Sequence, residues 1–134
     1  MDGRETAAVL EASRLLARLA QSIDLGDADA IAELFVPDGV LEGLLSGKTL
    51  EGRDAIREFF AERELARDQS LARRRHHVAT INARLDGDVV RSTSYFNVIG
   101  PGGTVAGVYN DELVETDDGW RIKRKTINVE YRGE

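Results

Sequence analysis

The chain contains no cysteine among its 134 residues, and this absence excludes several kinds of chemistry. Without a thiol there can be no disulfide, no thiolate nucleophile and no zinc–thiolate site. Its only two histidines, His76 and His77, are adjacent. Because neighbouring residues of a strand point to opposite faces of a sheet, these imidazoles do not converge on one metal ion. We therefore expect no metal site.

Long apolar runs and an excess of basic charge are also missing. No stretch approaches the roughly 20 apolar residues of a membrane span, and the N-terminus lacks the apolar core of a signal peptide. With 18 basic and 24 acidic side chains the net charge is −6, which disfavours nucleic acid as a partner. The run Arg73-Arg74-Arg75 has no interleaved aromatics, so we expect a solvated edge or an interface ion pair there.

Motifs for common cofactors and nucleophiles are absent as well. No glycine-rich loop joins a strand to a helix, as a dinucleotide or nucleotide-phosphate site requires, and no nucleophilic serine motif occurs. Taken with the missing membrane and export signals, these absences predict a cytoplasmic protein that uses no cofactor and binds neither membrane nor nucleic acid.

What the sequence does contain is the pattern of an ordinary globular domain. Hydrophobic residues make up 42% and charged residues 31% of the chain, which is long enough to bury one core. We expect a single domain over residues 1–134. Apolar residues at helical spacing predict a helix over residues 5–21, a short second helix after the N-cap Asp27, and a third after Asp54 that extends towards Leu65.

Strand patterns dominate the second half of the chain. A first strand is predicted from Val40 to Leu45, after a turn at Pro37-Asp38-Gly39. From His77 onward the apolar period becomes two, and glycine-containing turns separate strands over residues 77–85, 89–99, 104–115 and 120–131. The pattern predicts an α+β fold in which three N-terminal helices cover one side of a curved antiparallel sheet.

Five short motifs occur in an order that resembles a known family. They are Ile23-Asp24-Leu25-Gly26-Asp27 with Glu33 to Asp38, Leu50 to Ile56, Arg75-His76-His77-Val78, Gly107 to Asp111, and Asp118 to Ile122. This order resembles the SnoaL-like branch of the nuclear transport factor two-like superfamily. The resemblance implies a conical barrel of a curved mixed sheet and three helices, a pocket at its wide end, and a homodimer formed through the outer face of the sheet.

The resemblance also indicates a pair of site residues. In dehydratase-like members an aspartate after the first helix pairs with a histidine on the sheet, and the matching positions here are Asp24 and His76. A carboxylate that accepts from one imidazole nitrogen raises the basicity of the other, which can then remove a proton. The residues by themselves also allow a plainer interpretation, in which Asp24 caps the chain and His76 makes an ordinary polar contact.

Strand parity allows only one of the two histidines to face the pocket. His77 shares the parity of Ala79 and Ile81, whereas His76 shares that of Val78 and Thr80. The family pattern matches His76, although a β-bulge would exchange the two. We expect His76 to be the base, and His77 to be either a substrate contact or a solvated or interface residue.

Four further residues are candidates for binding substrate: Tyr95, Tyr109, Asp111 and Trp120. A phenol can orient a carbonyl or hydroxyl group, although strand tyrosines and Trp120 are also typical core residues. An acid inside a sheet needs a partner, and Arg124 or Lys125 on the next strand would supply one for Asp111. The family commonly has an arginine where Lys125 stands, and a lysine cannot make the same bidentate contact.

Two positions depart from better-known enzymes of the superfamily. Leu19 stands where several of them place a tyrosine, and Gly43 stands where ketosteroid isomerases carry their base, while Glu42 has the opposite parity. These departures disfavour such an isomerase. The sequence and the resemblance together predict a cofactor-independent dehydratase, lyase or cyclase that acts on a small hydrophobic ring-bearing metabolite. The alternative is a non-catalytic module for small-molecule binding or dimerisation on the same fold.

Overall fold

The structure, a computed structural model, describes residues 1–67 and 73–133. Its helices are α1 (Gly3–Leu25), α2 (Ala28–Glu33) and α3 (Arg53–Leu65). Its strands are β1 (Phe35–Glu42), β2 (Leu50–Glu51), β3 (Arg75–Asp86), β4 (Val89–Gly100), β5 (Gly103–Thr116) and β6 (Gly119–Gly133). The predicted α+β class and the order of the helices and strands are confirmed.

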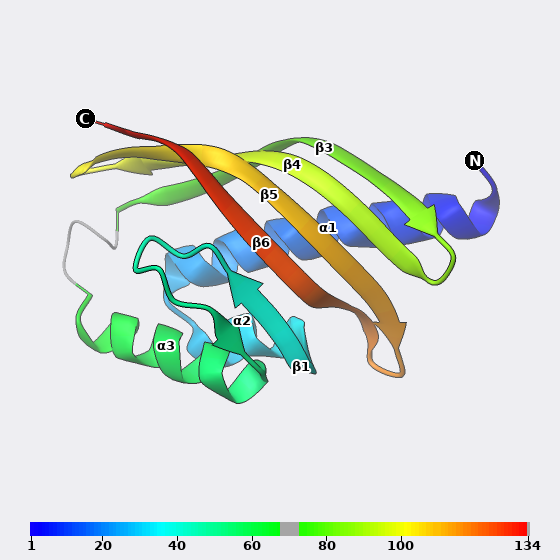
Figure 1. The fold of residues 1–134 in the computed structure, drawn as a ribbon, viewed down its shortest axis with the longest axis horizontal. Coiled ribbons are helices and arrows are strands. Elements are labelled where there is room, and N and C mark those ends of the chain that lie inside the picture. The colour runs from blue at the N-terminus through cyan, green and yellow to red at the C-terminus, as the bar shows by residue number, and fades with distance from the viewer. Residues whose placement is uncertain (68–72, 134) are drawn as a thin grey trace.

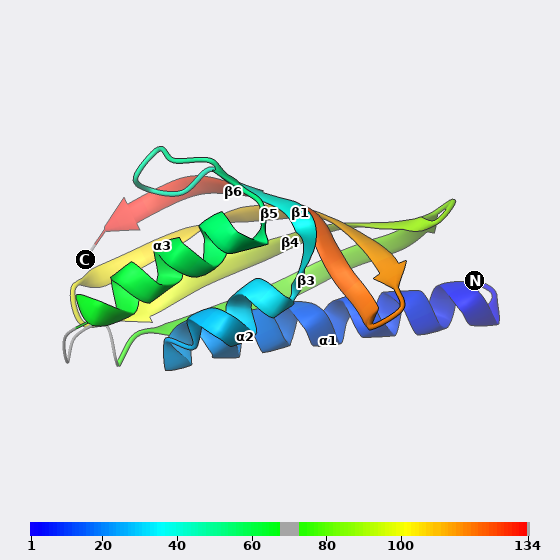
Figure 2. The ribbon, with the colours of Figure 1, turned by 90° about the horizontal axis from the view of Figure 1, so that it is seen from below.

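The six strands form one mixed sheet in the order β2-β1-β6-β5-β4-β3. Strand β1 runs parallel to β6, and the other neighbouring strands are antiparallel. The long strands curve around α1 (Figure 1), while α2 and α3 cover the remainder of the concave face (Figure 2). Within the described residues the sheet stays open, with β2 and β3 at its edges, so the cone is not closed. No helix in the described part of the chain is long and apolar enough to cross a membrane.

Helix α1 is longer at both ends than the predicted 5–21. It begins after Asp2, whose side chain accepts the Glu5 N–H at 2.8 Å, and it ends at Gly26 in the left-handed conformation with φ 70°. Its buried face repeats every three to four residues and comprises Ala8, Ala12, Leu15, Leu16 and Leu19. The apolar side continues into the last turn, where Ile23 packs against the core one residue before Asp24.

The predicted turn at Pro37-Asp38-Gly39 is wrong, because these residues lie inside strand β1. The register between β1 and β6 shifts between Phe35 and Val40, so the turn-forming residues form an irregularity within the strand. The start of α3 is tied to this segment, since Arg53 Nε donates to the Phe35 carbonyl at 3.0 Å. Strand β1 then ends at Glu42, before the predicted Leu45, because Gly43 turns the chain with φ 84°.

A bulge in β3 changes which alternate residues of this strand face the helices. The register between β3 and β4 shifts between Ala79 and Asn82, and Thr80 adopts a positive φ of 53°. On one side of the bulge Val78 packs against the inner face, and on the other side Ala83 and Leu85 do so. The bulge therefore allows residues of opposite parity, His76 and Leu85, to share one face of the sheet.

Two apolar clusters fill the concave side unequally. The larger one joins α1, α2, β1 and α3 with the sheet through residues such as Leu15, Ile31, Phe35 and Ile56. A smaller cluster of Phe96, Val98 and Tyr109 lies further along β4 and β5. The larger cluster gives the domain its core, while the smaller one forms part of a wall that helices do not fully cover.

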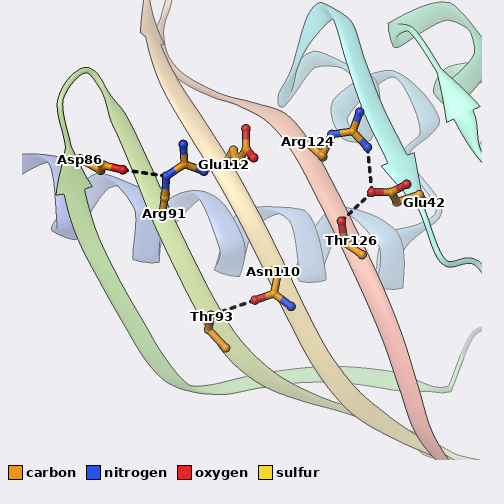
Figure 3. Close-up of polar contacts among 8 residues, drawn as sticks. All are labelled: Glu42, Asp86, Arg91, Thr93, Asn110, Glu112, Arg124 and Thr126. Atoms are coloured by element: carbon orange, nitrogen blue, oxygen red, sulfur yellow. Dashed lines mark hydrogen bonds and ion pairs between the residues drawn. The ribbon is translucent and has the colours of Figure 1, made fainter.

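The opposite face of the sheet is polar at its centre. Figure 3 shows side chains turned away from α1, with Arg91 bonded to Asp86 at 2.9 Å and Thr93 bonded to Asn110 at 2.9 Å. Glu42 lies on the same face and accepts from Arg124 at 2.7 Å and from Thr126 at 2.8 Å. These hydrogen bonds lower the pKa of Glu42 and keep it ionised outside the concave side.

Candidate functional site

A cavity of about 750 Å³ lies between the concave face of the sheet and the helices. Its lining includes residues from the end of α3, the β4–β5 turn and the end of β6, segments that lie at one end of the molecule (Figure 1). Its walls are mainly apolar and include Leu19, Ile23, Phe59, Phe60, Phe96 and Val98. A mainly apolar cavity of this size with a few polar groups is typical of a small-molecule site.

Asp24 and His76 meet in this cavity. Nδ1 of His76 lies 2.7 Å from Oδ1 of Asp24, and the His76 backbone N–H lies 3.1 Å from both carboxylate oxygens. The side chains of Asp24 and His76 are 12% and 19% exposed, respectively. The carboxylate assigns the proton to Nδ1, which leaves Nε2 as the nitrogen that can accept one.

The end of α1 places Asp24 for this contact. A carboxylate in the last helical turn is disfavoured by the negative end of the helix dipole, and no basic residue stands in that turn. The N–H groups of His76 offset this cost. Arg67, just after α3, secures the same turn, because its Nη2 donates to the Asp24 carbonyl at 2.5 Å while Nη1 pairs with Glu64 at 3.2 Å.

Burial is the main influence on the protonation of His76. It lowers the pKa of the imidazole below the ordinary 6.5, and the positive charges of Arg63 and Arg74 lower it further. Asp24 acts in the opposite direction through its hydrogen bond and its charge, without reversing the shift. The imidazole is therefore neutral near pH 7, which is the form that a general base requires.

Tyr109 and Lys125 form a second polar group in the cavity wall. The Tyr109 ring stacks on Phe96 with centroids 4.2 Å apart, and Nζ of Lys125 lies 3.5 Å from the centroid of the Tyr109 ring. Nζ also lies 3.2 Å from Oδ1 of Asp111. Burial raises the pKa of the Tyr109 phenol, as do the charges of Asp111 and Asp24, so this hydroxyl remains a proton donor.

The structure does not bring the other candidate residues to the cavity. His77 is exposed and pairs with Asn97 on the face turned away from the helices, because it lies one position along the strand from His76. Tyr95 also lies on that face and is 55% exposed. Trp120 packs against the larger core cluster. Asp111 is 3% exposed and reaches the cavity through Lys125.

Several cavity residues were missed by the sequence analysis. Arg63, Arg67, Arg74 and Arg132 all line the cavity, from the end of α3, the start of β3 and the end of β6. Helical spacing does indicate which side of α3 is polar, but it does not indicate that this end of the helix meets two distant strand ends. Of the run Arg73-Arg74-Arg75, Arg74 lines the cavity and donates to the Pro101 carbonyl at 3.1 Å.

The position that ketosteroid isomerases use for their base is closed to any side chain. A Cβ added to Gly43 would lie 1.9 Å from the Ile127 carbonyl oxygen. The neighbouring Glu42 is held on the other face by Arg124 and Thr126 (Figure 3). The structure thus explains why this position carries glycine.

Comparison with solved structures identifies the same architecture elsewhere. Rv3472 of Mycobacterium tuberculosis, a protein of unknown function, is 27% identical with a TM-score of 0.79 over 92% of this chain and 72% of that one. A candidate scytalone dehydratase from Novosphingobium aromaticivorans is 21% identical with a TM-score of 0.79 over 91% and 83% of the two chains. An NTF2-like protein with a cystatin-like fold from the same organism is 24% identical with a TM-score of 0.74 over 96% and 90%.

The family is settled by the sequence itself. No curated protein matches the chain. The model of the SnoaL-like domain, however, matches residues 4–126, which is nearly the whole chain and includes both Asp24 and His76. The protein therefore belongs to the SnoaL-like domain family.

Proposed function

We propose that this protein is a cofactor-independent enzyme that uses Asp24 and His76 as a general-base pair. Its reaction is the elimination of water from a small hydrophobic ring-bearing metabolite, or a related cyclisation. The observation that carries the proposal is the 2.7 Å contact between Asp24 Oδ1 and His76 Nδ1 at the wall of a mainly apolar cavity. The contact turns a neutral imidazole into an oriented base where apolar rings can be bound.

The elimination step follows from the two nitrogen atoms of His76. Nε2 takes a proton from a carbon next to the substrate carbonyl, and the electrons of that C–H bond form a carbon–carbon double bond. The hydroxyl on the next carbon leaves and takes the proton back from the imidazolium, which releases water. Asp24 stabilises the imidazolium through Nδ1–H. The Tyr109 hydroxyl, kept protonated, donates to the carbonyl oxygen as negative charge develops there.

Structural likeness to the candidate scytalone dehydratase supports the choice of elimination over other reactions of the fold. A non-catalytic binding module on the same fold would use the cavity without needing the free Nε2. Turnover therefore separates the two functions. Suitable test compounds are cyclic β-hydroxyketones, whose dehydration gives a conjugated product that absorbs in the ultraviolet.

The pH dependence of turnover tests the role of His76. Protonated imidazole cannot accept a proton, so kcat/KM should rise with pH as His76 loses its proton and then become level. Because burial lowers the pKa, the midpoint should lie below 6.5. The measurement is the initial rate between about pH 4.5 and 8. His77→Gln should leave the midpoint unchanged, and a rate that falls over this range, or no turnover of any compound, would contradict the proposal.

We further propose that two copies associate through the outer face of the sheet. Around its polar centre this face carries three large exposed side chains. Tyr95, Ile99 and Tyr131 are 55%, 50% and 54% exposed to solvent, respectively. We expect light scattering to give twice the chain mass, and Tyr95→Glu/Ile99→Glu to give a monomer because charge replaces apolar contact area. Leu10→Glu on α1, which is 58% exposed away from this face, is the matched control. A monomeric wild-type protein would refute the dimer.

A further inference from the structure

The cavity carries an excess of cationic side chains, although the whole chain has a net charge of −6. Four arginines line it, namely Arg63, Arg67, Arg74 and Arg132, together with Lys125. The carboxylates in its lining are Asp24 and Glu64. Lys125 is balanced by Asp111, and Glu64 is paired with Arg67. The positive charge that remains belongs to arginines from separate segments of the chain.

Two of these arginines have no structural task in the described part of the chain. Arg67 and Arg74 donate to the carbonyl groups of Asp24 and Pro101 and thereby hold the backbone. By contrast, the side chains of Arg63 and Arg132 make neither a hydrogen bond nor an ion pair with any residue in 1–67 or 73–133. A guanidinium group keeps its five donors at all physiological pH values, so these two side chains are available to a ligand.

The arginines also act on the proposed base. The positive charges of Arg63 and Arg74 reach His76 and contribute to its lowered pKa. Arg63 comes from α3 and Arg132 from the end of β6, and both ends lie at the same end of the molecule (Figure 1 and Figure 2). Like charges gathered around one cavity repel one another unless an anion is bound among them.

We propose that the ligand of this cavity is an amphiphilic carboxylic acid, whose apolar ring occupies the cavity and whose carboxylate is bound by Arg63 and Arg132. The proposal rests on the function above for the choice of site, and it adds the chemical class of the substrate. The planar guanidinium fork matches a carboxylate, and charge-assisted hydrogen bonds of this kind are stronger than neutral ones. A neutral metabolite of the same shape would leave both arginines unpaired.

Binding of two matched probes tests this inference without any need for turnover. The probes are 2-naphthoate and 2-naphthol, which share the ring system and differ in charge, measured by isothermal titration calorimetry with the full chain. At low ionic strength we expect 2-naphthoate to bind about tenfold more tightly than 2-naphthol. The preference should shrink at about 0.5 M salt, because exposed charges are screened.

Matched arginine variants locate the effect. In Arg63→Gln/Arg132→Gln the tenfold preference for 2-naphthoate should disappear while the affinity for 2-naphthol stays the same. Arg14→Gln/Arg18→Gln on α1 removes the same charge outside the cavity lining and should retain the preference. Equal affinity of the wild type for both probes, no binding of 2-naphthoate at millimolar concentration, or an equal loss in the α1 control would each overturn the proposal.

The two proposals fail in distinguishable ways. If 2-naphthoate binding depends on Arg63 and Arg132 but no hydroxyketone or hydroxyacid is turned over, the charge inference stands and the enzyme proposal fails. If elimination depends on His76 while the two probes bind equally, the enzyme proposal stands. The inference that the ligand carries a carboxylate is then refuted.

Discussion

Replacement of His76 by glutamine is expected to lower kcat for elimination by about 10²- to 10⁴-fold, which is the usual contribution of a general base. Glutamine retains the backbone N–H that donates to both oxygens of Asp24, so the contact between the end of α1 and β3 should be kept. Its amide cannot accept a proton from carbon. Binding of 2-naphthoate should therefore stay within about threefold of the wild type, since binding and proton transfer use different groups.

The adjacent histidine supplies the control for this experiment. His77→Gln makes the same chemical change one residue away, on the opposite face of the sheet and outside the cavity lining. We expect it to retain wild-type kcat. Comparable losses in the two variants would mean that the effect comes from the strand and not from the base, and an active His76→Gln enzyme would remove His76 from the mechanism. Circular dichroism of both variants checks that the fold is retained.

The second large effect is expected on stability. Replacement of Lys125 by methionine should lower the free energy of unfolding by about 3–5 kcal/mol, because it leaves the buried carboxylate of Asp111 without its counter-ion. Lys125 and Asp111 are each 3% exposed, with Nζ 3.2 and 3.3 Å from the two carboxylate oxygens. The change also removes the cation from the Tyr109 ring. Denaturation in urea with fluorescence detection measures the effect.

The loss of stability in Lys125→Met should depend on pH, and the burial of Asp111 sets the sign of that dependence. Burial raises the pKa of Asp111, and in Lys125→Met the opposing charge of the lysine is gone. The folded state of the variant then binds a proton more tightly than the unfolded state does, so its stability falls as pH rises. The difference from the wild type should be largest near neutral pH and should shrink on acidification. If the difference in unfolding free energy between the wild type and Lys125→Met grew as the pH was lowered, this account would be contradicted.

Two further variants separate charge from packing. Lys123→Met on the same strand changes an exposed lysine and should cost little. Lys125→Met/Asp111→Val replaces both charges with apolar groups and should recover most of the stability, because no buried charge is left unpaired. If the double variant is as unstable as the single one, the loss reflects packing around Tyr109 and not the ion pair.

Much of the fold could be predicted from local patterns. The turns at Gly87 and Gly119 and the alternation of the long strands predicted the β3 to β6 meander within a few residues. The failure at Pro37 has a tertiary cause. Residues typical of a turn form an irregularity within β1, between two positions, Phe35 and Val40, that pair with β6. This parallel partner lies more than 80 residues further along the chain, and no local pattern reports such a pairing.

The candidate site was predictable only in part. Family motifs pointed to Asp24 and His76, and parity separated His76 from His77 because alternate residues of a strand face opposite sides. The same argument did not exclude Tyr95 in advance, since parity says that two faces exist but not which one the helices cover. The cavity arginines gave no usable signal, because Arg63 on α3 and Arg132 on β6 line the same cavity only once the chain has folded.

The sequence by itself determined the fold class, the family and the small set of groups able to carry chemistry near neutral pH, because these depend on composition, on periodicity and on residue types in order. Only the tertiary structure decided that Asp24 receives both the ring and the backbone N–H of His76, 52 residues away. It also decided that Lys125 is buried against Asp111, and that Arg63 and Arg132, whose side chains have no partner among the described residues, line the cavity. Distances between remote segments are set by how the core packs, and packing is a property of the whole chain.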